Sequence, residues 1–125
     1  MEKAWIEYLE KTWGLNSNFA AQIYRFLYWA NYYGLRPQIV SGFRDPAKQK
    51  AMRARWDAGN RQGLRQRPAE TSEHTRTSWG RPAASAIDIA TTDDRMAARL
   101  AQSLRIGAGL AFKEPDPGHY FQVST

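Results

Sequence analysis

Residues 72–90 read SEHTRTSWGRPAASAIDIA, and the end of this stretch places an acid inside an otherwise apolar strand. Successive side chains of a strand point to opposite faces, so Ile87 and Ile89 would face one way and Asp88 the other. The neighbours of Asp88 on its own face are alanines, which leave space above the sheet. Because an unpaired buried carboxylate is costly, Asp88 requires either an arginine partner or a metal ion. Both interpretations are open at this point.

The periodicity around this strand predicts an α+β fold. Apolar spacing and capping residues predict helices over 3–13, over 18–33, over about 12 residues after Asp45, and over the stretch TTDDRMAARLAQSLR. Strands are predicted at 37–42, at 85–91 and in two segments joined by KEPDPG, whereas 60–84 has no sustained period. We therefore expect one domain over 1–125, with helices at 3–33 and a sheet region at 37–123. The sheet should be small and mixed or antiparallel, with helices packed on one side.

The two N-terminal helices are rich in aromatic residues. Trp5, Leu9 and Trp13 recur every four positions in the first helix, and the second carries an apolar stripe of Phe19, Ile23, Phe26, Leu27 and Ala30. The aromatic residues could form a sugar-stacking surface, but their helical spacing favours the core.

Caps are predicted from polar residues and glycine. Asn16 or Ser17 can cap the second helix, and Gly34 suits its end. Thr91 or Thr92 can cap the last helix.

Composition limits the chemistry that is available. The chain has 125 residues and no cysteine, so any metal must be held by His, Asp or Glu. The N-terminal stretch MEKAWIEYLEKTW lacks an apolar core, which predicts synthesis in the cytoplasm without a signal peptide, and no stretch predicts membrane insertion.

The net charge of +6 lies between Phe43 and Arg81, where ten basic residues face four acids. Such a field attracts an anionic polymer, either nucleic acid or a cell wall, although an ordinary solvated face is the alternative.

The two histidines and a nearby acid complete a possible metal site. Singly, His74 and His119 are more often surface or hydrogen-bonded residues than ligands. Together with Asp88 they form a two-histidine, one-carboxylate set that suits Zn²⁺ with one position open to water. Asp116, three residues before His119, would then be the carboxylate that takes a proton from that water.

Four short motifs occur in one order along the chain. They are SGFR at 41–44, Ser72-x-His74, ASAID at 84–88 and Asp116-x-x-His119. This order resembles the LAS-type zinc peptidases of family M15, the D-Ala-D-Ala carboxypeptidase and L-alanyl-D-glutamate endopeptidase group, which includes phage endolysins. The resemblance covers about residues 37–123. It implies a hedgehog/DD-peptidase-like fold and one zinc ion.

The resemblance also implies roles for single residues. His74, Asp88 and His119 would be the zinc ligands, and Asp116 the general base and later proton donor. Arg44 would orient substrate or stabilise the charged intermediate, because a guanidinium suits an oxyanion or a carboxylate. Ser72 and Gln49 would contact substrate, with a solvent-facing helical glutamine as the alternative for Gln49.

The chain departs from the family pattern at one place. His74 and Asp88 are fourteen residues apart, whereas the family has seven. Residues 77–83 therefore resemble an insertion, and Ala84 stands where the family usually has glycine.

The expected function is hydrolysis of peptidoglycan stem peptides, at either the L-Ala-D-Glu or the D-Ala-D-Ala bond. The resemblance favours a monomeric phage-type endolysin that reaches an anionic cell wall, in the periplasm or outside, after lysis or on the virion. Nucleic acid is the less favoured partner. A non-catalytic basic binding protein and a virion structural protein on the same scaffold are the alternatives.

Overall fold

The computed structural model describes residues 2–62, 73–78 and 80–123. Within these residues the α-helices are α1 (Glu2–Trp13), α2 (Ser17–Tyr32), α3 (Pro46–Asp57) and α4 (Asp94–Ser103), and the single-turn 3₁₀ helices are η1 (Glu73–Thr75) and η2 (Gly109–Ala111). The main sheet consists of β1 (Gln38–Ser41), β4 (Ala86–Ala90), β5 (Ile106–Ala108) and β6 (His119–Gln122). A separate hairpin is formed by β2 (Thr77–Ser78) and β3 (Arg81–Pro82).

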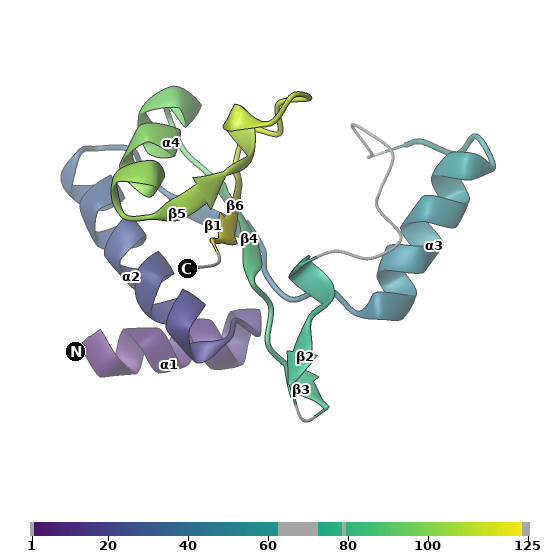
Figure 1. The fold of residues 1–125 in the computed structure, drawn as a ribbon, viewed down its shortest axis with the longest axis horizontal. Coiled ribbons are helices and arrows are strands. Elements are labelled where there is room, and N and C mark those ends of the chain that lie inside the picture. The colour runs from purple at the N-terminus through teal and green to yellow at the C-terminus, as the bar shows by residue number, and fades with distance from the viewer. Residues whose placement is uncertain (1, 63–72, 79, 124–125) are drawn as a thin grey trace.

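The main sheet has the strand order β1-β4-β6-β5, and each neighbouring pair is antiparallel. Helices α1, α2 and α4 lie on one side of it, whereas α3 stands apart on the other side (Figure 1). The predicted α+β fold with a small sheet covered by helices on one side is therefore confirmed. No described helix is long and apolar enough to cross a bilayer.

The covered face of the sheet is the hydrophobic core. Ile87 and Ile89 of β4 are almost fully buried there, as the strand alternation predicts. Tyr120 pairs with Ile87 across β4 and β6, and its ring lies 4.9 Å from that of Phe26 on α2. Burying such side chains is the main source of stability in a domain of this size. Because strand side chains alternate, the burial of Ile87 and Ile89 also places Asp88 on the opposite face of the sheet.

The ends of α2 follow the predicted capping chemistry. The Oδ1 atom of Asn16 accepts a hydrogen bond from the Phe19 amide at 2.9 Å. At the other end Gly34 has a φ of +74°, and the Leu35 amide donates to the Ala30 carbonyl at 2.9 Å. Glycine adopts this left-handed conformation without steric cost, which ends the helix and turns the chain toward β1.

The cap of α4 differs from the prediction. Its N-cap is Asp93, whose Oδ1 accepts from the Met96 amide at 3.1 Å, and neither Thr91 nor Thr92 caps the helix. The Thr92 amide instead donates to the Leu35 carbonyl at 2.9 Å. This bond ties the end of β4 to the α2–β1 connection and shifts the helix start by one residue.

The aromatic residues of α2 are divided between core and surface, so the favoured interpretation, core, is right for three of the six: Phe19, Tyr24 and Phe26. The predicted stripe is buried or half-buried, and Phe19, Ile23 and Phe26 fill the inner face of the helix. The later aromatic residues project from other sides of the helix and are exposed: Tyr28, Trp29, Tyr32 and Tyr33. In α1, Leu9 is buried but Trp5 is exposed.

The stretch between the predicted α3 and β4 contains more structure than the sequence indicated. Residues 77–78 and 81–82 pair as the short hairpin β2–β3, turning at Gly80 with a φ of +74°. Ala84 then lies fully buried, bonded through its backbone to Gly14 and Asn16. Residues 63–72 and Trp79 lie outside the described residues.

Replacing Phe26 by alanine should lower the free energy of unfolding by about 3–5 kcal/mol, because a fully buried ring is lost and a cavity remains. Urea denaturation of purified protein measures this value. Tyr28→Ala, two residues later and 56% exposed, is the matched control and should change stability by less than about 0.5 kcal/mol. Equal losses in both variants would contradict the assignment of the inner face.

Candidate metal centre

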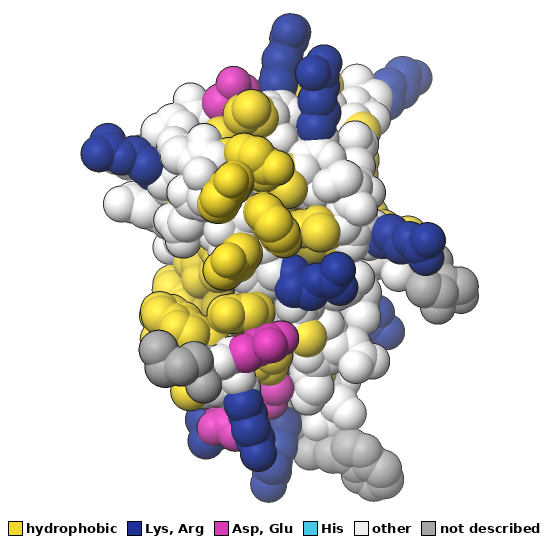
Figure 2. Space-filling model, turned by 90° about the vertical axis from the view of Figure 1, so that its left-hand side faces the viewer, with side chains coloured by type: hydrophobic (Ala, Val, Ile, Leu, Met, Phe, Trp, Pro, Cys, Tyr) yellow, Lys and Arg dark blue, Asp and Glu magenta, His cyan; other side chains and the backbone are white. Residues whose placement is uncertain are grey.

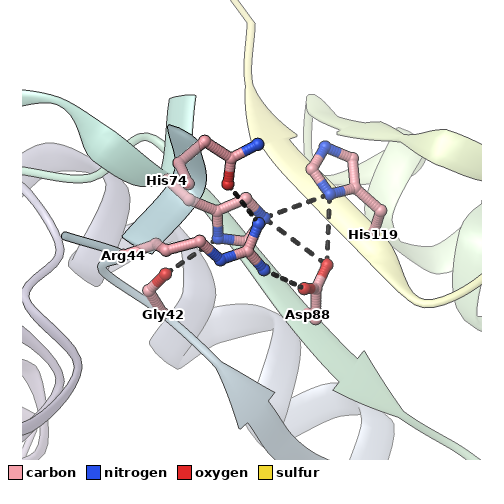
Figure 3. Close-up of polar contacts among 6 residues, drawn as sticks. Gly42, Arg44, His74, Asp88 and His119 are labelled. Atoms are coloured by element: carbon pink, nitrogen blue, oxygen red, sulfur yellow. Dashed lines mark hydrogen bonds and ion pairs between the residues drawn. The ribbon is translucent and has the colours of Figure 1, made fainter. Parts of the chain in front are cut away.

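Three side chains from separate elements meet above the open face of the sheet. His74 comes from η1, Asp88 from the middle of β4 and His119 from the start of β6 (Figure 3). One ligand atom from each of the three lies within 4.8 Å of the others. Asp88 and His119 are register partners on neighbouring antiparallel strands, so their side chains emerge on the same face. The topology therefore brings these three sequence-predicted residues together.

The buried ring of His74 is oriented by a backbone hydrogen bond at the ring nitrogen that does not face Asp88. Its Nδ1 donates to the Gly42 carbonyl at 2.8 Å, and its backbone carbonyl accepts from the Arg44 amide at 2.7 Å. A carbonyl can only accept, so Nδ1 carries a proton, and Nε2 is the ring nitrogen that faces Asp88 and His119. A histidine ligand is oriented in this way in many metal sites. No sequence pattern indicates the Gly42 carbonyl, since any residue supplies one.

The ring of His119 is held by aromatic neighbours. Phe121, two residues along β6, stacks on it with ring centroids 5.9 Å apart and planes inclined by 29°. Phe112 lies 6.0 Å away and also stacks on Phe121. These contacts fix the ring so that Nδ1 points at Asp88. The alternation in HYFQV places Phe121 on the same strand face as His119, which is the sequence signal for this contact.

The separations within the group fit a tetrahedral metal site. His119 Nδ1 lies 3.1 Å from Asp88 Oδ1, His74 Nε2 lies 3.3 Å from His119 Nδ1, and His74 Nε2 lies 3.5 Å from Asp88 Oδ1. Ligands bound tetrahedrally at about 2.0–2.1 Å from zinc are roughly 3.3 Å apart. Once the two imidazoles have released the protons on these nitrogens, the three atoms would direct lone pairs at one point, where a cation would hold them. The residues present thus fit Zn²⁺.

The electrostatics of Asp88 favour the charged carboxylate. Burial alone would raise the pKa of Asp88, but hydrogen bonds and positive charge from His119 and His74 outweigh it. Together they hold that pKa well below its ordinary value. Asp88 is therefore ionised at neutral pH, as a metal ligand must be.

The second oxygen of Asp88 faces Arg44. The Nη2 atom of Arg44 is 3.9 Å from Asp88 Oδ2, while Oδ1 faces the histidines. Arg44 Nη1 donates to Gln49 Oε1 at 2.7 Å. An arginine partner for Asp88 is thus present at one carboxylate oxygen, while the other oxygen belongs to the group that could hold a metal ion.

Gln49 is 2% exposed, so a solvent-facing glutamine is wrong; its hydrogen bond positions the Arg44 guanidinium at the edge of the site.

Asp116 is half-buried in the loop that leads into β6 and is not one of the three grouped ligands. Its amide donates to the Gly109 carbonyl at 2.9 Å, and its carbonyl accepts from the His119 amide at 3.3 Å. A side chain at position 109 would meet both Asp116 and His119, so glycine there permits this close approach. The loop holds Asp116 beside His119. Ser72 lies outside the described residues.

Comparison with known proteins supports the fold. No protein-family model matches the chain. No curated protein matches it in sequence. Among solved structures, the L-Ala D-Glu endopeptidase ChiX from Serratia marcescens is similar, with a TM-score of 0.58 and 15% sequence identity. The match covers 98% of this chain and 86% of that chain. The fold is therefore one that this peptidase shares.

His119→Ala should abolish stoichiometric zinc binding, because it removes one of the three candidate side-chain ligands that meet among the described residues. Zinc content after dialysis against trace metal, measured by mass spectrometry, should fall from one ion per chain to none. Asp94→Asn, an exposed acid on α4, is the control and should keep one ion. A full equivalent of zinc in His119→Ala would overturn the ligand set.

Gly42→Ala should weaken zinc binding by about 10–100-fold without removing a ligand. A methyl group at Gly42 would meet the Trp13 carbonyl, so the backbone must shift and move the carbonyl that holds His74. Competition with a fluorescent chelator measures the affinity.

Gly34→Ala is the control for this substitution. It is strained by a φ of +74° but lies at the end of α2, so it should lower stability and leave zinc affinity unchanged. Identical affinities in the two variants would refute the role of the Gly42 carbonyl.

Proposed function

We propose that this protein is a zinc-dependent peptidase that hydrolyses the stem peptides of peptidoglycan. The observation that carries the proposal is the His74–Asp88–His119 group, whose ligand separations suit tetrahedral zinc. The fold shared with an L-Ala D-Glu endopeptidase supports the same activity and favours the L-Ala-D-Glu bond over the D-Ala-D-Ala bond. The motif order that resembles LAS-type peptidases supports it independently of the fold.

His74, Asp88 and His119 would hold the zinc ion. When bound, zinc would supply a Lewis acid and make water a usable nucleophile at neutral pH. The chain's own part is to hold the ion rigidly. The Gly42 carbonyl fixes His74, the β4–β6 register fixes Asp88, and the stacked Phe121 fixes His119.

Asp116 would serve as the general base and then the general acid. Its carboxylate takes a proton from the attacking water as the water oxygen bonds to the scissile carbonyl carbon. When the C–N bond breaks, Asp116 returns that proton to the leaving amine. Its place in the loop three residues before His119 supports this role.

Arg44 would bind the negative charge of the substrate or of the tetrahedral intermediate. Its side chain is 25% exposed, and its guanidinium contacts Gln49 through Nη1 and Asp88 through Nη2. A planar guanidinium with several donors suits a carboxylate or an oxyanion.

The basic middle third of the chain supports an anionic cell wall as the surface on which the enzyme acts. Action on that wall as a phage-type endolysin, or from a virion, belongs to the same proposal.

Asp116→Ala should keep one zinc ion and lose hydrolysis by about 10²–10⁴-fold, the usual contribution of a general acid–base. Mass spectrometry of muropeptides digested with purified, zinc-loaded protein measures the activity and identifies the bond that is cut. Glu114→Gln, an exposed acid on the same loop, is the matched control and should retain activity. Undiminished hydrolysis by zinc-loaded Asp116→Ala would refute the role of Asp116.

A further inference from the structure

The last turns of α2 expose four neighbouring aromatic rings, which we name the aromatic face. Its members are Tyr28, Trp29, Tyr32 and Tyr33, with exposed fractions of 56%, 38%, 70% and 53%. The inner side of the same helix is already filled by the core residues, so these rings contribute little to folding. Large exposed apolar patches on a soluble domain commonly mark binding sites. The aromatic face therefore needs an explanation outside the fold.

The rings of the aromatic face support one another. Trp29 contacts the other three, with centroids 5.3 Å from Tyr28, 5.5 Å from Tyr32 and 6.2 Å from Tyr33. Most of these contacts are edge to face, including that of Tyr32 with Tyr33 at 5.1 Å and 87°. Edge-to-face packing restrains the rings but leaves flat surfaces open. The result is a preorganised surface of ring planes.

The aromatic face lies away from the metal centre. Helix α2 packs on the Ile87 and Tyr120 side of the sheet, whereas Asp88 and His119 emerge on the other side. Viewed from the side on which Figure 1 places α1 and α2, the molecule shows hydrophobic side chains gathered in a band, with basic and acidic side chains around it (Figure 2). An occupant of this surface would leave the metal centre open.

The size of the aromatic face argues against a protein partner. With about 150–250 Å² per aromatic side chain, the four rings at these exposures present roughly 400 Å². A stable protein interface needs about 800 Å² from each partner. The surface is thus about half of what a second copy of the chain would require, but it is large enough for a few sugar rings.

The composition of the aromatic face points to a carbohydrate. Tyrosine and tryptophan combine flat apolar faces with O–H and N–H groups, and none of the four members is aliphatic. The flat C–H faces of pyranose rings can stack on such rings while sugar hydroxyls bond to the phenol and indole groups. The charge of this segment also suits a wall polymer with carboxylates, because α2 and the turn that follows it, residues 17–36, contain two basic residues and no acid.

We propose that the aromatic face binds the glycan strand of peptidoglycan by stacking. This inference rests on the proposed function for the choice of polymer. The enzyme would hold a glycan strand on the outer side of α2 while a stem peptide enters the metal centre on the other side. The aromatic face would then keep the enzyme bound to the insoluble cell wall.

The test uses the full chain and peptide-free glycan strands, prepared by amidase treatment of sacculi and immobilised on beads. Wild-type protein should bind, and Trp29→Ala and Tyr32→Ala should each weaken binding by roughly tenfold or more, as the loss of an aromatic stacking partner does elsewhere. Tyr32→Phe should retain most of the affinity, because the ring remains. Tyr32→Leu should lose it, because an aliphatic side chain offers bulk without a flat face.

Two controls decide between stacking and unspecific adhesion. Trp5→Ala removes an equally exposed aromatic residue from α1 and should bind as wild type does. Equal loss in Trp5→Ala, or full binding by Tyr32→Leu, would overturn the proposal, and so would failure of the wild type to bind. Circular dichroism of each variant confirms folding, which is expected because all three changed positions are exposed.

The glycan-binding proposal and the peptidase proposal can be disproved independently of each other. The strands contain no peptide bond, so binding to them does not depend on hydrolysis. Cleavage of a soluble stem peptide tests the metal centre alone, and Tyr32→Ala should leave it unchanged. A protein that cleaves the peptide but ignores the strands would disprove the glycan site and leave the peptidase proposal intact.

Discussion

The antiparallel pairing of β4 with β6 is the constraint on which the candidate site depends. It sets Asp88 opposite His119 on one face and Ile87 opposite Tyr120 on the other. Because side chains alternate, a slip of one residue would turn the carboxylate into the core and an isoleucine into solvent. Burial of Ile87, Ile89 and Tyr120 against the helices therefore holds the polar face in place. The hydrophobic effect on one side of the sheet fixes the chemistry on the other.

The side chains on the polar face of the sheet are arranged around one carboxylate, that of Asp88. Asp88 has two oxygens with different partners, the histidine pair at Oδ1 and Arg44 at Oδ2. The desolvation that would favour a neutral acid is outweighed by the two histidines, which lower the pKa of Asp88. Arg44 is restrained by Gln49, which is buried although it lies on α3, the helix that stands apart in Figure 1. Side-chain contacts therefore connect α3 to the sheet through the candidate site, from Gln49 to Arg44 and from Arg44 to Asp88.

Features with a local physical cause were predictable from the sequence. The alternation around Asp88 placed it on the open face, and Asn16 and Gly34 marked the ends of α2. The meeting of His74 with the two strand residues was anticipated from residue types and motif order rather than from periodicity. Its position depends on a long-range bond to the Gly42 carbonyl, and backbone atoms leave no trace in a sequence.

Features that depend on competition between alternatives were not predictable. The aromatic residues of α2 fit either a core or a surface, and the choice depends on how much room the sheet leaves beside Phe19, Ile23 and Phe26. Asp93 caps α4, while the hydroxyl and the amide of Thr92 donate to the Gly34 and Leu35 carbonyls. Only the assembled fold decides such cases.

One irregularity of the sheet has a wider effect. β1 is an edge strand, and its pairing with β4 passes from Ile39 opposite Ile89 to Ser41 opposite Asp88, so Val40 is an extra residue. Such a bulge bends a strand and re-aims the residues that follow it. After the bulge the chain leaves the β1–β4 pairing at Ser41, and the Gly42 carbonyl bonds to His74. A bent, interrupted border is also a poor template for a foreign strand, so the same inserted residue protects the molecule from edge-to-edge aggregation.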